Sequence, residues 1–142
     1  MIEIQIDDGA RPGHRERLHR AVAATLDHEG VEEGEISLSL MSDAAIQGLN
    51  RDHLGHDYPT DVLAFALWSP GEPVLGDVYV GVEQAVRQAR EEGVPVEEEL
   101  VRLAIHGTLH ILGHDHPDEA GARPESPMYG LQEELVRVVL AG

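Results

Sequence analysis

The chain has 142 residues, with ten arginines, no lysine, no cysteine and 27 acidic residues, which give a net charge of −17. The lack of cysteine excludes disulfides, thiolate metal sites and cysteine nucleophiles, and the acidity argues against nonspecific binding of polyanions. Neither a signal-peptide pattern nor an apolar run of roughly 20 residues is present, so we expect a cytoplasmic protein without a membrane partner, built as one domain over residues 1–142.

The first third of the chain alternates between predicted strands and helices. Apolar residues alternate with polar ones over 2–7 and 36–41, which is the period of a strand with one buried face. Apolar residues at helical spacing predict a helix over 13–28. Ser42 is a candidate N-cap for a second helix that begins at Asp43.

The rest of the chain continues this mixture. The apolar run 62–68 is typical of a strand buried on both faces, and it follows a loop over 54–60. The remaining predicted elements are a turn at 69–73, a strand at 77–82, helices at 83–92, 96–113 and 128–140, and a loop at 114–127. We therefore expect an α/β (α+β) fold in which helices cover a small mixed sheet of about four strands.

Four of the nine histidines lie in the segment HGTLHILGHDH, residues 106–116. His106 and His110 are one helical turn apart, so both imidazoles can reach one ion at about 2.0–2.1 Å. Gly113 can end the helix in the left-handed conformation and return His116 to the same point as a third ligand. Three imidazoles with an open fourth position predict one catalytic zinc ion per chain. The alternative is a helix end that carries surface or capping histidines.

The spacing HxxxHxxGxxH is also that of the metzincin proteases. In HExxH enzymes the glutamate at the second position is the base that activates water, and here that position is Gly107. Glycine has no basic group. Hydrolysis of a bond other than the peptide bond is therefore the better interpretation.

The histidine segment resembles the signature of the YbeY family, described as single-strand-specific endoribonucleases that act in small-subunit rRNA maturation and ribosome quality control. LNRDHLGHDYPTDVLAFA at 49–66 and LGDVYV at 75–80 are also similar to family segments. The resemblance implies a fold distantly similar to the zincin metalloproteases and a zinc ion on His106, His110 and His116. It implies single-stranded RNA, the small ribosomal subunit and ribosome-assembly proteins as partners.

One loop departs from the family pattern. The family has Tyr-Arg and then a lysine after Leu-Asn, and this chain has His53, Leu54 and His56 there, so the expected phosphate-binding arginine is missing. Arg51 lies three positions before Leu54 and reaches the same side if the helix from residue 43 runs that far. Arg51 is thus one candidate catalytic residue. His114, which we expect to face substrate or solvent, is the other.

Further candidates have equally simple structural interpretations. Asp61 and Asp77 flank predicted strands and either face the cleft or end a strand. Phe65 either stacks on a base or packs in the core. Asp115 or Asp118 can support a metal ligand through its second ring nitrogen.

Three functions remain open from the sequence. The first is a zinc-dependent endoribonuclease of rRNA maturation. The second is a metallohydrolase acting on a peptide or small molecule, and the third is a non-catalytic, metal-stabilised ribosome-assembly factor.

Overall fold

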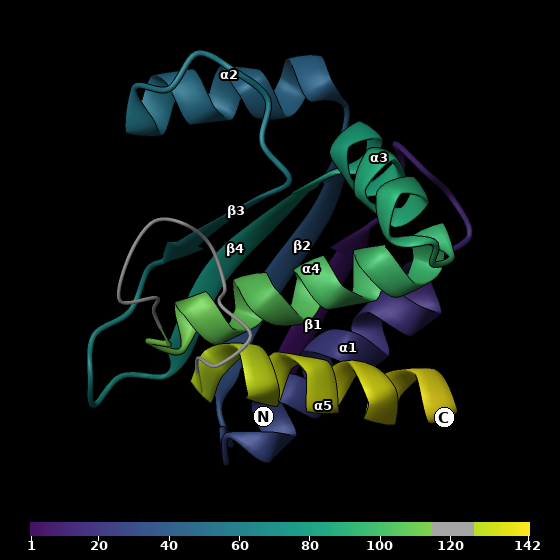
Figure 1. The fold of residues 1–142 in the computed structure, drawn as a ribbon. Coiled ribbons are helices and arrows are strands. Elements are labelled where there is room, and N and C mark those ends of the chain that lie inside the picture. The colour runs from purple at the N-terminus through teal and green to yellow at the C-terminus, as the bar shows by residue number, and fades with distance from the viewer. Residues whose placement is uncertain (115–126) are drawn as a thin grey trace.

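The four strands form one mixed sheet in the order β1-β2-β4-β3 (Figure 1). The computed structural model describes residues 1–114 and 127–142. The strands are β1 (Ile2–Asp7), β2 (Gly34–Met41), β3 (Val62–Ala66) and β4 (Val74–Gly81). β1, β2 and β4 are parallel, and β3 runs antiparallel to β4 at one edge. The predicted mixed sheet of about four strands is confirmed.

The described residues also form five helices. They are α1 (Arg15–His28), α2 (Asp43–Leu54), α3 (Val82–Glu92), α4 (Val96–Ile111) and α5 (Pro127–Ala141). α4 is central, since it contacts α1, α3, α5, β3 and β4, whereas α2 lies apart beyond the β3 end of the sheet (Figure 1). None of the helices in the described part of the chain is long and apolar enough to cross a membrane.

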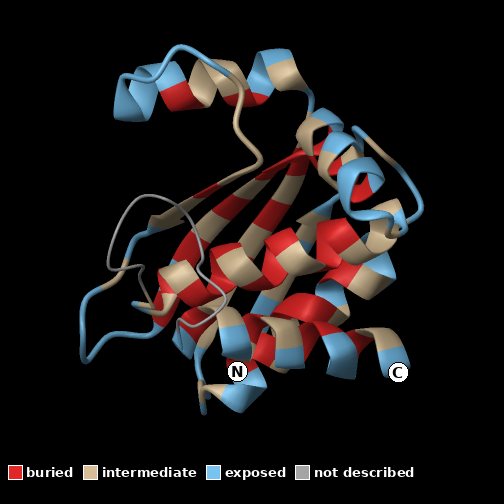
Figure 2. Ribbon diagram, viewed as in Figure 1, coloured by how far each residue is buried: buried red, intermediate tan, exposed pale blue. Residues whose placement is uncertain are grey.

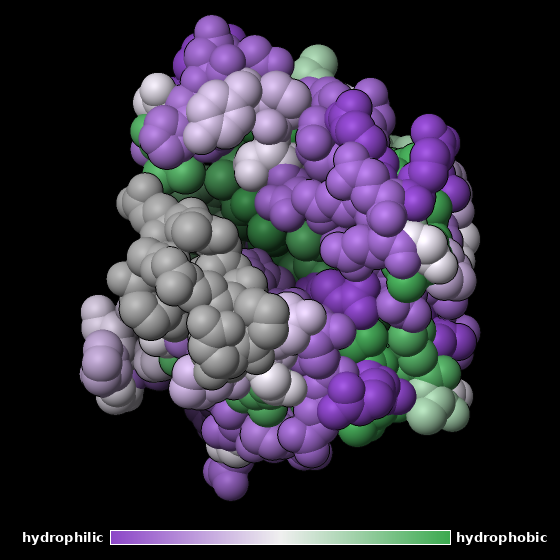
Figure 3. Space-filling model, viewed as in Figure 1, coloured by the Kyte–Doolittle hydropathy of each residue, from purple (hydrophilic) through white to green (hydrophobic). Residues whose placement is uncertain are grey.

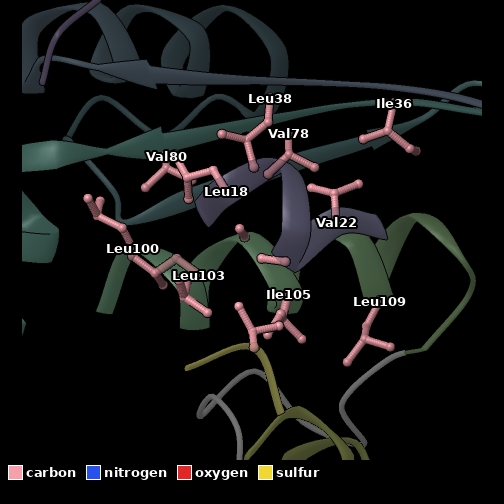
Figure 4. Close-up of a cluster of buried hydrophobic side chains, with 14 of the residues drawn as sticks. Leu18, Val22, Ile36, Leu38, Val78, Val80, Leu100, Leu103, Ile105 and Leu109 are labelled. Carbon is pink, nitrogen blue, oxygen red and sulfur yellow. The ribbon is translucent and has the colours of Figure 1, made fainter. Parts of the chain in front are cut away.

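The core lies between one face of the sheet and the helices α1 and α4, with α5 on their outer side (Figure 2). Fully buried side chains from both layers meet there (Figure 4): Ile36 and Leu38 of β2, Val78 and Val80 of β4, Leu18 and Val22 of α1, and Leu100, Ile105 and Leu109 of α4. Ten residues of α4 are buried. Because α4 is packed on nearly all sides, the core fixes its rotation and height above the sheet.

One strand prediction was wrong. The apolar run 62–68 predicts a strand buried on both faces, but β3 ends at Ala66, and of its five residues only Leu63 is buried. Leu67, beyond its end, is 56% exposed. The reason is that β3 is an edge strand, with β4 as its one neighbour among the described strands, so its side chains are covered less fully than those in the middle of the sheet.

Two glycines allow α4 to lie very close to the sheet. A Cβ added at Gly107 of α4 would lie 2.6 Å from Cγ1 of Val78 in β4. A Cβ added at Gly76 of β4 would lie 2.6 Å from Cδ1 of Ile111 at the other end of the contact. No side chain fits at either glycine without displacing a core residue.

The close approach predicts a clear stability effect. Gly107→Ala should lower the free energy of unfolding by about 1–3 kcal/mol, because the new methyl overpacks the core against Val78. Gly48→Ala is the matched control, since it is also a helical glycine but its nearest foreign atom is the Arg51 side chain at 3.8 Å. It should stabilise the protein by roughly 0.5–1 kcal/mol through helix propensity. Urea unfolding of both variants measures the difference, and equal effects of the two substitutions would contradict the packing argument.

Candidate metal centre

A cavity of about 600 Å³ lies between the end of α2, the outer edge of β3 and the C-terminal half of α4. The described residues that line it are Leu54, Asp61, Val62, Leu63, Ala64, Phe65, Ala66, His106, His110, Gly113 and His114. In the space-filling view apolar residues line a hollow below α2, beside the grey atoms (Figure 3). The cavity therefore brings two predicted metal ligands and the predicted catalytic His114 together on apolar walls.

The predicted helical pair is in place. His106 and His110 project from the same face of α4, with their Nε2 atoms 3.0 Å apart and their ring centroids 4.6 Å apart. Two nitrogen ligands of one tetrahedral zinc ion, each about 2.0–2.1 Å from the metal, lie about 3.3 Å from one another. The two nitrogens thus have nearly the separation that a shared ion requires.

Gln132 of α5 determines which nitrogen of His106 carries the proton. The Gln132 side chain is 4% exposed, with its Nε2 donating to Oε2 of Glu133 at 3.1 Å and its Oε1 lying 2.7 Å from Nδ1 of His106. Because an ionised Glu133 only accepts, the amide oxygen must face His106, whose Nδ1–H then donates to it. The lone pair on Nε2 of His106 is left pointing toward His110. This is the usual arrangement by which an outer residue orients a metal-binding histidine.

Arg102 keeps Glu133 ionised. Its Nε lies 2.8 Å from Oε2 of Glu133, and its Nη atoms bond Glu98 and Glu99. Burial raises the pKa of Glu133, but the hydrogen bonds from Arg102 and Gln132 outweigh it, so the pKa lies below its ordinary value. For Glu99, which is 3% exposed, burial prevails and the pKa is raised despite the same arginine. The arginine therefore supports the site through Glu133 and Gln132.

His114 belongs to the cavity wall and also contacts α1. Its Nε2 bonds the carboxylate of Glu29, the residue that caps α1. Burial raises the pKa of Glu29, but the hydrogen bonds of His114 and His28 outweigh it and leave the pKa below its ordinary value. Gly113 has φ of 99°, as predicted for a residue that ends the helix in a left-handed turn. His114 is thus held at the rim of the cavity by a carboxylate from another helix.

The third predicted ligand, His116, lies outside the described residues, as do Asp115 and Asp118. Among the residues that the structure does describe, no group of three histidine, aspartate or glutamate side chains is placed to hold a metal ion. The three-histidine site therefore stays a prediction. The structure gives positions for two of its three ligands, His106 and His110.

The loop that departs from the family pattern borders the cavity. Helix α2 runs to Leu54, so Arg51 and Leu54 lie on neighbouring turns of one helix, as the proposal for Arg51 required. Leu54 lines the cavity and is 50% exposed. Arg51 itself lies near carboxylates: its Nε is 3.1 Å from Oδ1 of Asp52 and its Nη1 is 3.9 Å from Oδ1 of Asp57. It is absent from the described cavity lining. Arg51 would have to leave these partners to act on a substrate.

The remaining candidates differ in whether they line the cavity. Asp61 lines the cavity and accepts from Nε2 of Gln88 at 3.1 Å, whereas Asp77 is bonded at 2.6 Å by Ser37 on β2. Phe65 lines the cavity and contacts the rings of His53 and Tyr79. Only Asp61 of the two aspartates faces the predicted site.

Sequence reasoning missed Gln132. The sequence feature that could have identified it is a polar residue at a buried position of a predicted helix. Gln132 lies between Met128 and Leu135, and both of these are buried. A buried amide needs a partner. Nothing in the sequence indicates that the partner lies 26 residues earlier on another helix.

Comparison with known proteins gives a consistent result. Residues 3–139 match the family model described as Endoribonuclease YbeY. Proteins named Endoribonuclease YbeY from Deinococcus radiodurans and Moorella thermoacetica are 40% and 49% identical to the chain, over 85% and 74% of it and 81% and 75% of their own lengths. A solution structure of a Thermotoga maritima protein is similar with a TM-score of 0.69 at 30% identity, covering 99% of this chain and 90% of that one.

The carboxylate network predicts a pH-dependent contribution to stability. Glu133→Gln should lower the free energy of unfolding at pH 7 by about 1.5–3 kcal/mol, the range for a hydrogen bond to a charged group. Because the folded pKa of Glu133 is lowered, its contribution is full above the ordinary value of 4.5 and is lost as the pH falls through the folded pKa. Urea unfolding at pH 7 and pH 3 should therefore show a difference between wild type and variant that shrinks at pH 3. A constant difference would show that the ion pair is not its source.

Proposed function

The chain belongs to the YbeY endoribonuclease family, and on that premise we propose that it is a zinc-dependent enzyme that cuts single-stranded RNA in small-subunit rRNA maturation and ribosome quality control. We further propose a cytoplasmic setting, with the small ribosomal subunit and ribosome-assembly proteins as partners. The observation that carries the proposal is the His106–His110 pair, two Nε2 atoms 3.0 Å apart in the wall of a cavity of about 600 Å³. A substrate strand and a metal would meet there.

The residues present fit a zinc ion. The chain has no cysteine, and imidazole nitrogen is a good zinc ligand. His106 and His110 are proposed as two ligands and His116 as the third. Bound zinc would supply a Lewis acid that polarises a phosphodiester oxygen. Gln132 holds His106 in the tautomer that leaves its Nε2 free of a proton, which prepares the ligand before the ion arrives.

The proposed catalytic residues differ in how well they are placed. His114 lies in the cavity wall, oriented by Glu29, and is the better candidate for contact with the substrate backbone. Arg51, held by Asp52 and Asp57, is the weaker one.

The net charge of −17 does not oppose this proposal at the site itself. Asp61 is the one carboxylate among the described residues that line the cavity, beside three histidines. Among the described residues the other acidic side chains lie outside this lining, so their repulsion of a phosphate at the site is weaker than the overall charge suggests.

A peptidase is disfavoured for a steric reason as well as a chemical one. Gly107 lacks the carboxylate that HExxH proteases use, and the 2.6 Å approach of Val78 leaves no room for a longer side chain there.

Metal content and RNA cleavage test the function together. The purified protein should contain about one zinc ion per chain and cut a single-stranded RNA, and His110→Ala should lose both properties. His19→Ala removes an exposed histidine of α1 and should keep both. Plasma mass spectrometry and a gel assay, with and without chelator, provide the measurements. Cleavage that survives chelation and His110→Ala would contradict a metal mechanism, and unchanged cleavage in His114→Ala or Arg51→Ala would remove that residue from the mechanism.

The role of Gln132 is tested through metal affinity. Gln132→Met keeps the volume but removes the acceptor for Nδ1 of His106, and it should weaken zinc binding by roughly 10–100-fold. Gln132→Glu keeps an acceptor oxygen and should bind zinc far better than the methionine variant. Competition with a zinc-binding dye measures both. Equal losses in the two variants would mean that Gln132 supports only the fold.

A further inference from the structure

Among the described residues, no second strand pairs with the outer edge of β3, whose backbone hydrogen-bonding groups are therefore left without a partner strand there. Asp61 accepts from the Gly81 N–H at 2.8 Å before β3 begins, and the Leu67 N–H donates to Leu75 at 2.8 Å after it ends. Bonded residues alternate along an antiparallel pair. Leu63 and Phe65 therefore bond β4, and the N–H and C=O groups of the alternate residues point outward: Val62, Ala64 and Ala66.

This outer edge faces the site. Val62, Ala64 and Ala66 line the same cavity as His106 and His110. Among the described residues none hydrogen-bonds these outward groups. Proteins usually cover or interrupt such an edge, because unpaired backbone groups recruit another chain. Here β3 carries neither proline nor charge, and no other described strand covers its outer edge beside the histidine pair.

We propose that the outer edge of β3 is the track on which the sugar–phosphate backbone of single-stranded RNA lies during cleavage. The N–H groups donate to phosphate oxygens, and the C=O groups accept from ribose 2′-hydroxyls. This inference rests on the proposed function, to which it adds the element that holds the substrate. Outward groups repeat every two residues, about 6.6–6.8 Å along the strand, a spacing comparable to that of successive phosphates in an extended single strand.

The chemistry of the edge favours RNA over DNA. A phosphate only accepts hydrogen bonds, so it satisfies the N–H groups but leaves each carbonyl oxygen facing another acceptor. The 2′-hydroxyl supplies the missing donor, and it is the group by which proteins distinguish RNA from DNA. A neutral edge also explains how an enzyme with no lysine and a net charge of −17 can hold a phosphate backbone, since amide donors add no net charge.

Amide hydrogen exchange on the full chain tests the track directly. In wild-type protein the Ala64 amide should exchange fast, and a saturating single-stranded RNA should slow it about ten-fold, as one new hydrogen bond would. DNA of the same sequence should slow it much less. The amides of Leu63 and Phe65 are internal controls, because they are already bonded to β4. A chelator-treated sample keeps the RNA intact, and cleavage is measured in parallel without chelator.

A pair of variants tests the same group by affinity. Ala64→Pro removes the outward N–H and leaves the β3–β4 hydrogen bonds, which is the position where an edge strand tolerates proline. RNA binding, measured by fluorescence anisotropy, should weaken about ten-fold. Ala64→Gly keeps the N–H and should bind like wild type. Melting temperatures show whether the proline variant folds, and the exchange experiment decides the question if it does not.

The outcomes separate this inference from the function on which it rests. Wild-type protein that cuts RNA while the Ala64 amide stays unprotected would overturn the track and leave the endoribonuclease intact. Failure of wild type to cut or bind RNA would instead overturn the proposed function. Protection of Ala64 by an extended peptide but not by RNA would also overturn the inference and identify β3 as a site for strand addition by a protein.

Discussion

The fold depends on how closely α4 lies on the sheet. Gly107 faces Val78 and Gly76 faces Ile111, and at both points a methyl group would come within 2.6 Å of a core atom. Interiors packed to this density do not adjust continuously. The height of α4 above β4 is therefore fixed, and with it the position of His106, which precedes Gly107, and of His110 one turn later.

The same contact links stability to chemistry. Close packing against Val78 requires glycine at position 107. The same requirement excludes the glutamate that acts as the base in HExxH proteases. Catalytic groups must come from elements around α4. The structure shows supporting contacts from two of these elements: Gln132 of α5 orients His106, and Glu29 at the end of α1 holds His114, the candidate catalytic residue. Both α1 and α5 pack against α4, and they also contact one another.

Much of this could be predicted from the sequence because the signals are local. Ser42 accepts from the Ala45 N–H at 3.2 Å, as its place before the α2 helix predicted. Gly113 has the positive φ that a helix-ending glycine suggested. The spacing of His106 and His110 needed only helical geometry. Each of these inferences depends on residues within one turn of one another.

The interpretations that failed depend on distant neighbours. The apolar run that begins at Val62 gives no indication that β3 lies at the edge of the sheet, where its side chains are only partly covered, because that follows from the order β1-β2-β4-β3. The role of Gln132 depends on its contacts with His106, on another helix, and with Glu133, and the sequence does not indicate the first of these. The family pattern drew attention to position 54, where an arginine was expected, and the structure places Leu54 in the cavity wall. What the chain lacks at Leu54 has to be supplied by other groups.

The missing arginine at position 54 is the reason why the outer edge of β3 matters, because its backbone groups can bind a phosphate in place of a cation. An arginine binds phosphate regardless of the nucleic acid that carries it. A cationic groove therefore gains affinity but distinguishes poorly between nucleic acids, and its affinity depends strongly on salt concentration. Backbone amides at fixed spacing bind only a strand whose acceptors and donors repeat in register, and they exclude a paired helix because one edge can follow one extended chain. An acidic protein with a neutral track would repel RNA that does not fit and retain RNA that does. The missing arginine and the net charge of −17 are then parts of one arrangement, in which geometry replaces charge as the source of selectivity.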